Sequence, residues 1–184
     1  GTLDNLVTPK TVEPYSRAEA ENFEIDYGTL EQYLGFFAGC KILVADPGAE
    51  IDLLAAVGRF DLIKEYVSFL RSRFDTVISS VHHGGITIPL LEENGIDLDG
   101  YIVPINEAGM YMFPIQERVV DAVRQTDKPV IAIKPMAGGR YLGTQAFEYV
   151  FNDVGVEACM FGMGTIEQVT ETATAARSVL GLRS

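Results

Sequence analysis

The sequence predicts an α/β protein built from parallel β/α units, with the organisation of a TIM barrel. Short, near-continuous apolar runs alternate with longer segments whose apolar residues recur at helical spacing, at intervals of about 25 to 35 residues. Each apolar run ends in glycine or polar residues, as is typical of a strand that leads into a loop. Strands and helices that alternate in this way form crossover connections, so the carboxyl ends of the strands lie on one edge of the sheet.

Five strands are expected, each followed by a helix. The strands are predicted over residues 40–45, 76–81, 101–105, 130–133 and 157–161. Their helices are predicted over residues 61–74, 88–93, 116–125, 144–151 and 166–180, and another helix precedes the first strand over residues 29–37. Residues 1–28 are expected to form an amino-terminal arm. Residues 29–184 form a single barrel-type domain in this prediction, because 184 residues suit one core.

The number of units favours an incomplete barrel. A complete barrel of eight units takes about 250 residues, and this chain supplies five clear units. The alternative is an open, doubly wound sheet of five parallel strands. An incomplete barrel exposes apolar strand edges, so we expect either a homo-oligomer or a second chain that completes the barrel.

Composition limits the partners of this acidic protein. A net charge of −12 disfavours nucleic acid, whose phosphates are bound by Lys and Arg. No apolar run approaches the roughly 20 residues of a membrane span, and the amino terminus lacks a basic segment followed by an apolar one. We therefore expect no membrane association and a cytoplasmic location. Cys40 and Cys159 have no metal-ligand spacing and are expected to be buried free thiols.

Polar residues at the strand ends are the candidate catalytic groups. They follow four different strands, and a parallel sheet brings such positions to one edge. Together they offer a carboxylate, an imidazole, an amide and an amine for acid–base chemistry. The candidates are Asp46, His82, His83, Asn106 and Lys134.

Four of these positions have competing interpretations. Asp46 precedes Pro47 and Gly48 and is equally expected to be a turn residue that bonds its own backbone. Lys134 ends a buried strand, where desolvation lowers an amine pKa and suits it to proton transfer or Schiff-base formation; the alternative is an ion pair with Asp46 or Glu107. His82 and His83 are the only histidines, and strand alternation points one of them toward the site. The alternative is a loop histidine that caps the following turn. No metal site is expected, because no cluster of ligands has suitable spacing.

Two glycine-containing loops predict an anion-binding rim. They follow the last two strands and precede helices near Thr144 and Thr165, and the first turn of a helix favours anions. In barrels the last two loops often bind a phosphate. The residues expected to bind a phosphate or a nucleotide cofactor are Gly138, Gly139, Arg140, Gly162, Gly164 and Thr165.

The same two segments resemble barrels of the aldo/keto reductase-like superfamily. Lys128–Arg140 resembles the seventh strand of that family with its loop, and Gly155–Thr165 resembles the eighth. The resemblance implies that both loops face the phosphate end of a nucleotide cofactor such as NADP. The chain departs from the family at Ile133 and Lys134, where the family places an aromatic residue against the nicotinamide. It also shows no counterpart of the family's acid–base tyrosine and lysine.

The sequence predicts a barrel-type enzyme that acts on a small phosphorylated or carbonyl-bearing metabolite by acid–base chemistry, in a lyase, isomerase or oxidoreductase type of reaction. Its partner would be a small anionic molecule at the rim. One alternative is an NAD(P)-dependent reductase similar to the aldo/keto reductases. The other is a non-catalytic ligand-binding or assembly subunit with a degenerate barrel.

Overall fold

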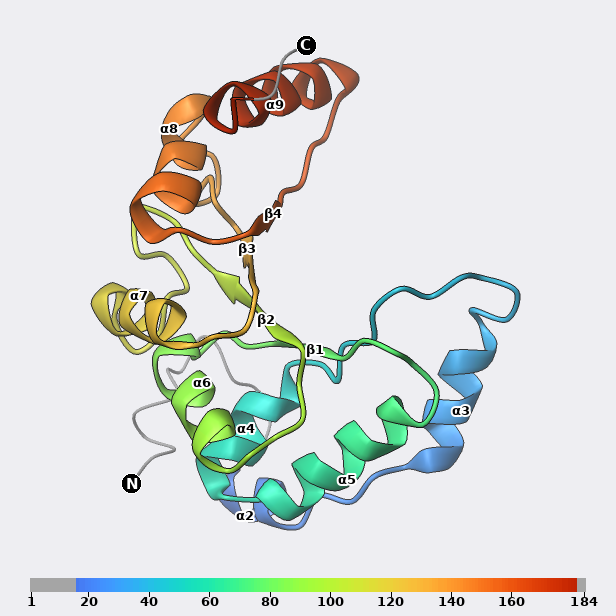
Figure 1. The fold of residues 1–184 in the computed structure, drawn as a ribbon. Coiled ribbons are helices and arrows are strands. Elements are labelled where there is room, and N and C mark those ends of the chain that lie inside the picture. The colour runs from blue at the N-terminus through green and yellow to red at the C-terminus, as the bar shows by residue number, and fades with distance from the viewer. Residues whose placement is uncertain (1–15, 182–184) are drawn as a thin grey trace.

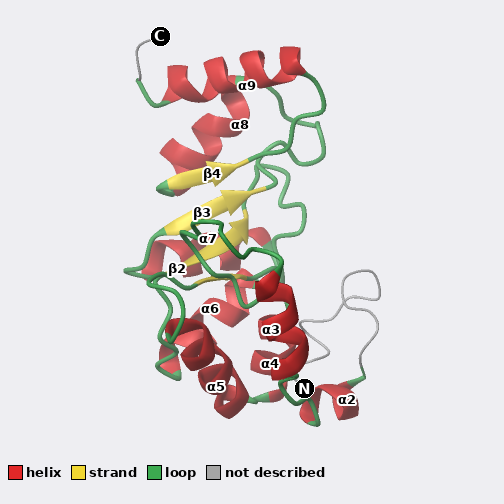
Figure 2. Ribbon diagram, turned by 90° about the vertical axis from the view of Figure 1, so that its right-hand side faces the viewer, coloured by secondary structure: helices red, strands yellow, loops and turns green. Residues whose placement is uncertain are grey.

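The computed structural model describes residues 16–181 and has an α/β fold with an open sheet of four parallel strands. The strands are β1 (Ile78–Ser80), β2 (Gly100–Pro104), β3 (Val130–Ile133) and β4 (Ala158–Met160), and they lie side by side in chain order. Figure 2 shows β2, β3 and β4 next to one another in this order. All three neighbouring pairs are parallel. The predicted fold class of parallel β/α units is confirmed.

Each strand leads into helical structure, as the crossover pattern requires (Figure 1). The connecting helices are α6 (Gly84–Glu93), α7 (Gln116–Gln125), α8 (Thr144–Phe147) with the π-helical turn η1 (Glu148–Val154), and α9 (Ile166–Val179). Four helices precede β1: α2 (Arg17–Glu21), α3 (Tyr27–Gly35), α4 (Glu50–Val57) and α5 (Phe60–Arg71). None of the described helices is long and apolar enough to cross a bilayer.

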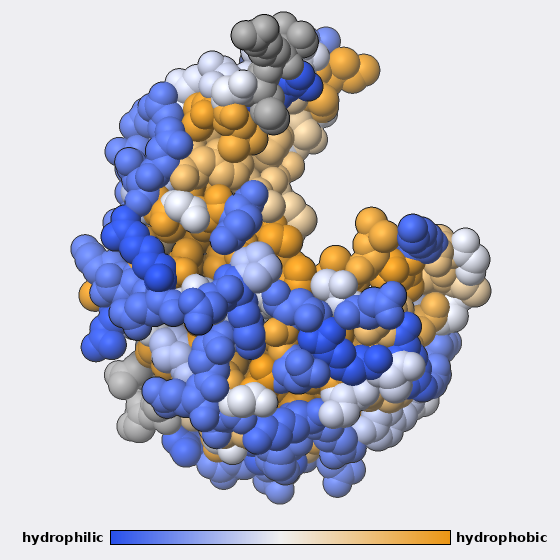
Figure 3. All heavy atoms as spheres, in the orientation of Figure 1, coloured by the Kyte–Doolittle hydropathy of each residue, from blue (hydrophilic) through white to orange (hydrophobic). Residues whose placement is uncertain are grey.

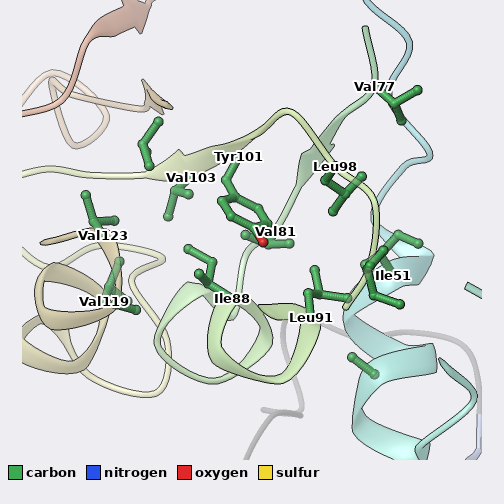
Figure 4. Packing of buried hydrophobic residues seen from close by; sticks show 14 of the residues in the cluster. Ile51, Val77, Val81, Ile88, Leu91, Leu98, Tyr101, Val103, Val119 and Val123 are labelled. Atoms are coloured by element: carbon green, nitrogen blue, oxygen red, sulfur yellow. The ribbon is translucent and has the colours of Figure 1, made fainter. Parts of the chain in front are cut away.

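The core lies between the outer face of the sheet and the helices. Tyr101 and Val103 of β2 are fully buried, and they point toward Ile88 of α6 and Val119 of α7 (Figure 4). The intervening residue, Ile102, points to the opposite face and is only half-buried. The alternation along each strand therefore separates a packed outer face from a less covered inner face.

The inner face of the sheet borders a hollow that opens to solvent. Ile102 pairs with Ile131 in the next strand, and Ile133 pairs with Met160. The first three are partly exposed and Met160 is 46% exposed. Helices follow the outer side of the curved sheet, whereas the hollow between α9 and α3 is bordered by apolar side chains (Figures 1 and 3). Parallel sheets are normally covered on both faces, so this face resembles the interior of an unclosed barrel.

The strand predicted over residues 40–45 does not form. Only Ala45 makes a bridge, with Val77, and Leu43 is 70% exposed. The physical reason is the lack of a pairing partner: α5 ends at Arg71 and β1 begins at Ile78, so little extended chain lies beside residues 40–44. Cys40 is consequently exposed, and its predicted burial is wrong, whereas Cys159 is partly buried.

Two helices lie where none was expected. The buried run of α4 includes every residue from Ile51 to Ala56, so it lacks the apolar–polar alternation by which a surface helix is recognised. Helix α2 falls within the segment predicted to be an amino-terminal arm. Its Ala20 is fully buried; residues 1–15 of that arm lie outside the described residues.

Gly84 and Gly85 allow α6 to approach its neighbours closely. A Cβ atom at Gly84 would lie 2.9 Å from Cγ1 of Val103, and one at Gly85 would lie 2.8 Å from Cβ of Arg118 in α7. Neither glycine adopts a positive φ. Their function in the fold is therefore close packing.

Candidate functional site

Lys134 occupies a strained position at the carboxyl end of β3. Its backbone has a φ of 58°, in the left-handed region that a non-glycine residue rarely adopts. The side chain is exposed, yet partial desolvation lowers the pKa of its amine. A lysine in this environment is a better proton donor than an ordinary surface lysine.

The amine of Lys134 meets the imidazole of His82. Nζ lies 3.4 Å from Nε2, although the two residues are 52 positions apart in the sequence. Burial lowers the pKa of His82, and the positive charge of Lys134 lowers it further. The arrangement therefore favours a neutral imidazole beside an ammonium group, with Lys134 donating and His82 accepting.

Residues with strained backbone conformations lie close to the pair of Lys134 and His82. Besides Lys134, the described non-glycine residues with positive φ are Tyr111 at 62° and Ala137 at 46°. The ring of Tyr111 lies 5.6 Å from Nζ of Lys134 and is 45% exposed. Conformations of this kind cost of order 1–3 kcal/mol each and cluster at functional sites. Tyr111 was missed from the sequence, because nothing in its local pattern predicts a positive φ.

His83, the residue next to His82, is 2% exposed. Its ring stacks on Phe113 at a centroid distance of 5.1 Å, and neither ring nitrogen has a hydrogen-bond partner. The two histidines thus point in different directions, and His82 is the one that meets Lys134. Nδ1 of His83 lies 3.7 Å from Oδ2 of Asp52, so this buried ring contacts Phe113 and lies near a buried carboxylate.

Asp46 and Asn106 lie at the predicted edge, but their side chains bond to nearby backbone. Asp46 accepts hydrogen bonds from the amides of Gly48 at 2.9 Å and Ser80 at 3.0 Å. Its negative charge still acts on His82, whose pKa it raises slightly. Asn106 is fully buried, and its amide bonds both the carbonyl and the N–H of Met110 at 2.9 Å. Asn106 therefore shapes the loop that carries Tyr111.

Asp52 is a further carboxylate that the sequence did not single out. It is 5% exposed and accepts hydrogen bonds from the backbone amide of His82 at 2.7 Å and from the hydroxyl of Thr87 at 2.5 Å. It comes from α4, the helix that was not predicted. Its charge opposes the lowering of the His82 pKa.

A cavity of about 810 Å³ lies beside Lys134. Its walls come from the loop after β3, from the end of β4 with its loop, and from α9. Most of the lining is apolar, and Lys134 and Glu171 are the only charged side chains in it. The lining residues are Ile133, Lys134, Pro135, Met136, Gly138, Gly139, Leu142, Gly143, Met160, Phe161, Gly162, Met163, Gln168, Glu171 and Thr172.

The two glycine loops both reach this cavity, but several of their polar groups are already bonded. Arg140 donates from Nη1 to the carbonyl of Ala137 at 2.8 Å and does not line the cavity. The amide of Gly164 donates to Oε1 of Gln168 at 2.7 Å. Thr165 caps α9 by accepting a hydrogen bond from the amide of Gln168 at 3.2 Å. Two of the predicted anion-binding groups, the Arg140 guanidinium and the amide of Gly164, therefore already have hydrogen-bond partners.

Among residues 16–181, no group of three or more His, Cys, Asp and Glu side chains is placed to hold a metal ion. Comparisons with known proteins find no significant match. This holds for protein-family models, for curated proteins and for solved structures. The structure establishes the α/β fold with its four-stranded parallel sheet. The resemblance of Lys128–Arg140 and Gly155–Thr165 to the aldo/keto reductase-like barrels stays a prediction.

Proposed function

We propose that the protein is an enzyme that transfers protons at the carbon next to the carbonyl group of a small, largely apolar metabolite. The observation that carries the proposal is the contact between Nζ of Lys134 and Nε2 of His82 at 3.4 Å, at the carboxyl end of the sheet. Catalytic side chains in parallel α/β folds gather at this edge. The two groups have the complementary protonation states that enolisation requires.

In this proposal each group has one role. The ammonium group of Lys134 donates a hydrogen bond to the carbonyl oxygen and stabilises the negative charge that develops there. When the ammonium group of Lys134 turns to the carbonyl oxygen, its hydrogen bond to His82 breaks and the lone pair of Nε2 becomes free. Nε2 then accepts the proton from the adjacent carbon and returns it to the same or a neighbouring carbon. The reaction is a proton shift and needs no further reactant. The left-handed backbone at Lys134 supports this assignment, since strain is retained where the geometry is used.

The cavity beside Lys134 supports an apolar substrate body. Methionine, leucine and phenylalanine side chains are among the lining residues together with Glu171. His82 is not among them, so Lys134 is the member of the pair that faces the cavity. A phosphate fits this lining poorly: Arg140 is bonded elsewhere, and Lys134 is the only cation. The same donor set does not fit the phosphates of a nucleotide cofactor, so we derive no hydride transfer here. The anionic ligand expected from the glycine loops is less well supported than a neutral carbonyl compound.

Exchange of carbon-bound hydrogen in heavy water tests the proposal. Cyclohexanone, 2-pentanone and dihydroxyacetone serve as probes, and loss of their α-proton signals is followed by NMR. We expect the protein to accelerate exchange in the two apolar ketones. Lys134→Met and His82→Gln should each reduce the catalysed rate by about 100-fold or more, which is the usual contribution of a positioned acid or base.

Arg140→Gln is the matched control. It removes a charge from the same loop, but the Arg140 guanidinium donates to the carbonyl of Ala137 rather than to Lys134 or His82, so exchange should be unchanged. Equal rates in the wild-type protein and Lys134→Met would refute the enzymatic role. A protein that binds the ketones without accelerating exchange would instead support the non-catalytic alternative.

A further inference from the structure

The carboxylate of Asp52 lies at the junction of three elements. It extends from the first turn of α4 to the short connection between β1 and α6, and it is 5% exposed. Oδ2 accepts from the amide of His82 at 2.7 Å, and Oδ1 accepts from the amide of His83 at 3.4 Å and from the hydroxyl of Thr87 at 2.5 Å. A buried carboxylate is costly unless it is hydrogen-bonded, so these donors hold it in one place.

The position of these bonds is informative. A carboxylate that only caps α6 would accept from amides within its first turn, where the amide of Gly85 is instead bonded to the carbonyl of Phe113. Asp52 accepts from the two residues that precede the helix. The bond to the amide of His82 fixes the peptide plane from which that side chain extends.

We propose that Asp52 is a positioning residue, whose carboxylate fixes the turn between β1 and α6 and thereby holds the His82 ring against Lys134. The inference rests on the proposed function for the use made of His82, whereas the bonds themselves do not depend on it. Besides Asp52, the charged and titratable groups that act on His82 are Lys134, His83 and Asp46. Of the two carboxylates among them, Asp52 is the one bonded to the backbone of His82 itself.

Asp52→Asn and Thr87→Val test this role as a pair. Asp52→Asn removes the charge and weakens the bond to the His82 amide, whereas Thr87→Val removes one hydroxyl donor and leaves that bond in place. In Asp52→Asn we expect hydrogen exchange at the His82 amide to accelerate by about tenfold, as loss of a charge-assisted hydrogen bond implies. In Thr87→Val that exchange rate should stay within about twofold after correction for global stability, because the His82 amide keeps its acceptor.

A second readout is the imidazole itself. The protein has two histidines, so the NMR signal lost in His82→Gln identifies His82. Its titration midpoint should fall in Asp52→Asn, because a nearby negative charge is removed, and should not move in Thr87→Val. Ketone exchange should fall by at least about tenfold in Asp52→Asn and by a smaller factor in Thr87→Val, in which the carboxylate and its bond to the His82 amide remain.

These outcomes separate the two proposals. If no variant or wild-type protein exchanges ketone protons, while the amide and titration shifts occur as expected, the proposed function fails and the positioning of His82 stands. If Asp52→Asn and Thr87→Val alter His82 equally, or neither does, Asp52 only stabilises the fold and the inference is overturned. Should Asp52→Asn fail to fold, Asp52→Glu keeps the charge and displaces it by one methylene group. Unchanged exchange at the His82 amide in that variant would overturn the inference as well.

Discussion

Replacing Lys134 by methionine should raise the pKa of His82. Methionine has an unbranched side chain of similar length without the charge, so the change removes a positive charge 3.4 Å from Nε2. Coulomb's law at that distance in a water-like dielectric gives about 1.2 kcal/mol, or roughly 0.9 pKa unit. A water-like dielectric constant, which gives this low interaction energy, applies because Lys134 is exposed.

The assay is an NMR titration of the His82 ring in both proteins between pH 4 and 8. A midpoint that rises by about one unit in Lys134→Met would agree with the contact. An unchanged or lower midpoint would mean that the two groups do not interact, and the proposed acid–base pair would lose its basis.

The same pair makes stability depend on pH with a defined sign. The folded state lowers the pKa of His82 below the ordinary value of 6.5, so the unfolded chain binds more protons between the two values. Stability contributed by this group is therefore complete above about pH 6.5 and is lost as the pH falls through the folded pKa. Urea unfolding at pH 8 and pH 5 should show a smaller acid loss for Lys134→Met than for the wild-type protein.

Three further predictions concern packing, thiol reactivity and assembly. Gly85→Ala should destabilise the protein by about 1 to 2 kcal/mol in urea unfolding, because the new Cβ would contact Arg118 and overpacking outweighs the better helix propensity; Gly35→Ala, with open space around it, should not. A maleimide should label the exposed Cys40 rapidly and Cys159 slowly, because burial raises the pKa of the Cys159 thiol to about 12; equal rates would contradict that burial. The open inner face predicts a dimer or larger assembly in size-exclusion chromatography, and a clean monomer would count against it.

The sequence predicted the regular part of the fold well, because crossover units leave a strong periodic pattern. Strand β3 (Val130–Ile133) and helix α7 (Gln116–Gln125) have the bounds that the sequence predicts. The apolar run over residues 40–45 failed, since apolar character shows that a segment seeks burial and does not show that a partner strand exists. Helix α4 was missed for the opposite reason, because a segment buried on all sides carries no amphipathic signal.

The candidate site was predicted in part. Position at strand ends was enough to bring Lys134 and His82 to one edge, and their contact follows from the parallel order of the strands. Local sequence did not reveal that the side chain of Asn106 would bond to Met110 in its own loop, or that Arg140 would donate to the carbonyl of Ala137. Those outcomes depend on loop conformations that glycines make possible but do not specify.

The left-handed backbone at Lys134 costs stability, whereas the proposed function requires the lysine side chain at this position. Asparagine or glycine adopts a φ of 58° more readily than lysine does. Replacing Lys134 by either residue should therefore increase the free energy of unfolding. A lineage that no longer required proton transfer should thus accept Asn or Gly at this position without loss of stability. Retention of lysine across divergent descendants would mark the chemistry as the trait under selection.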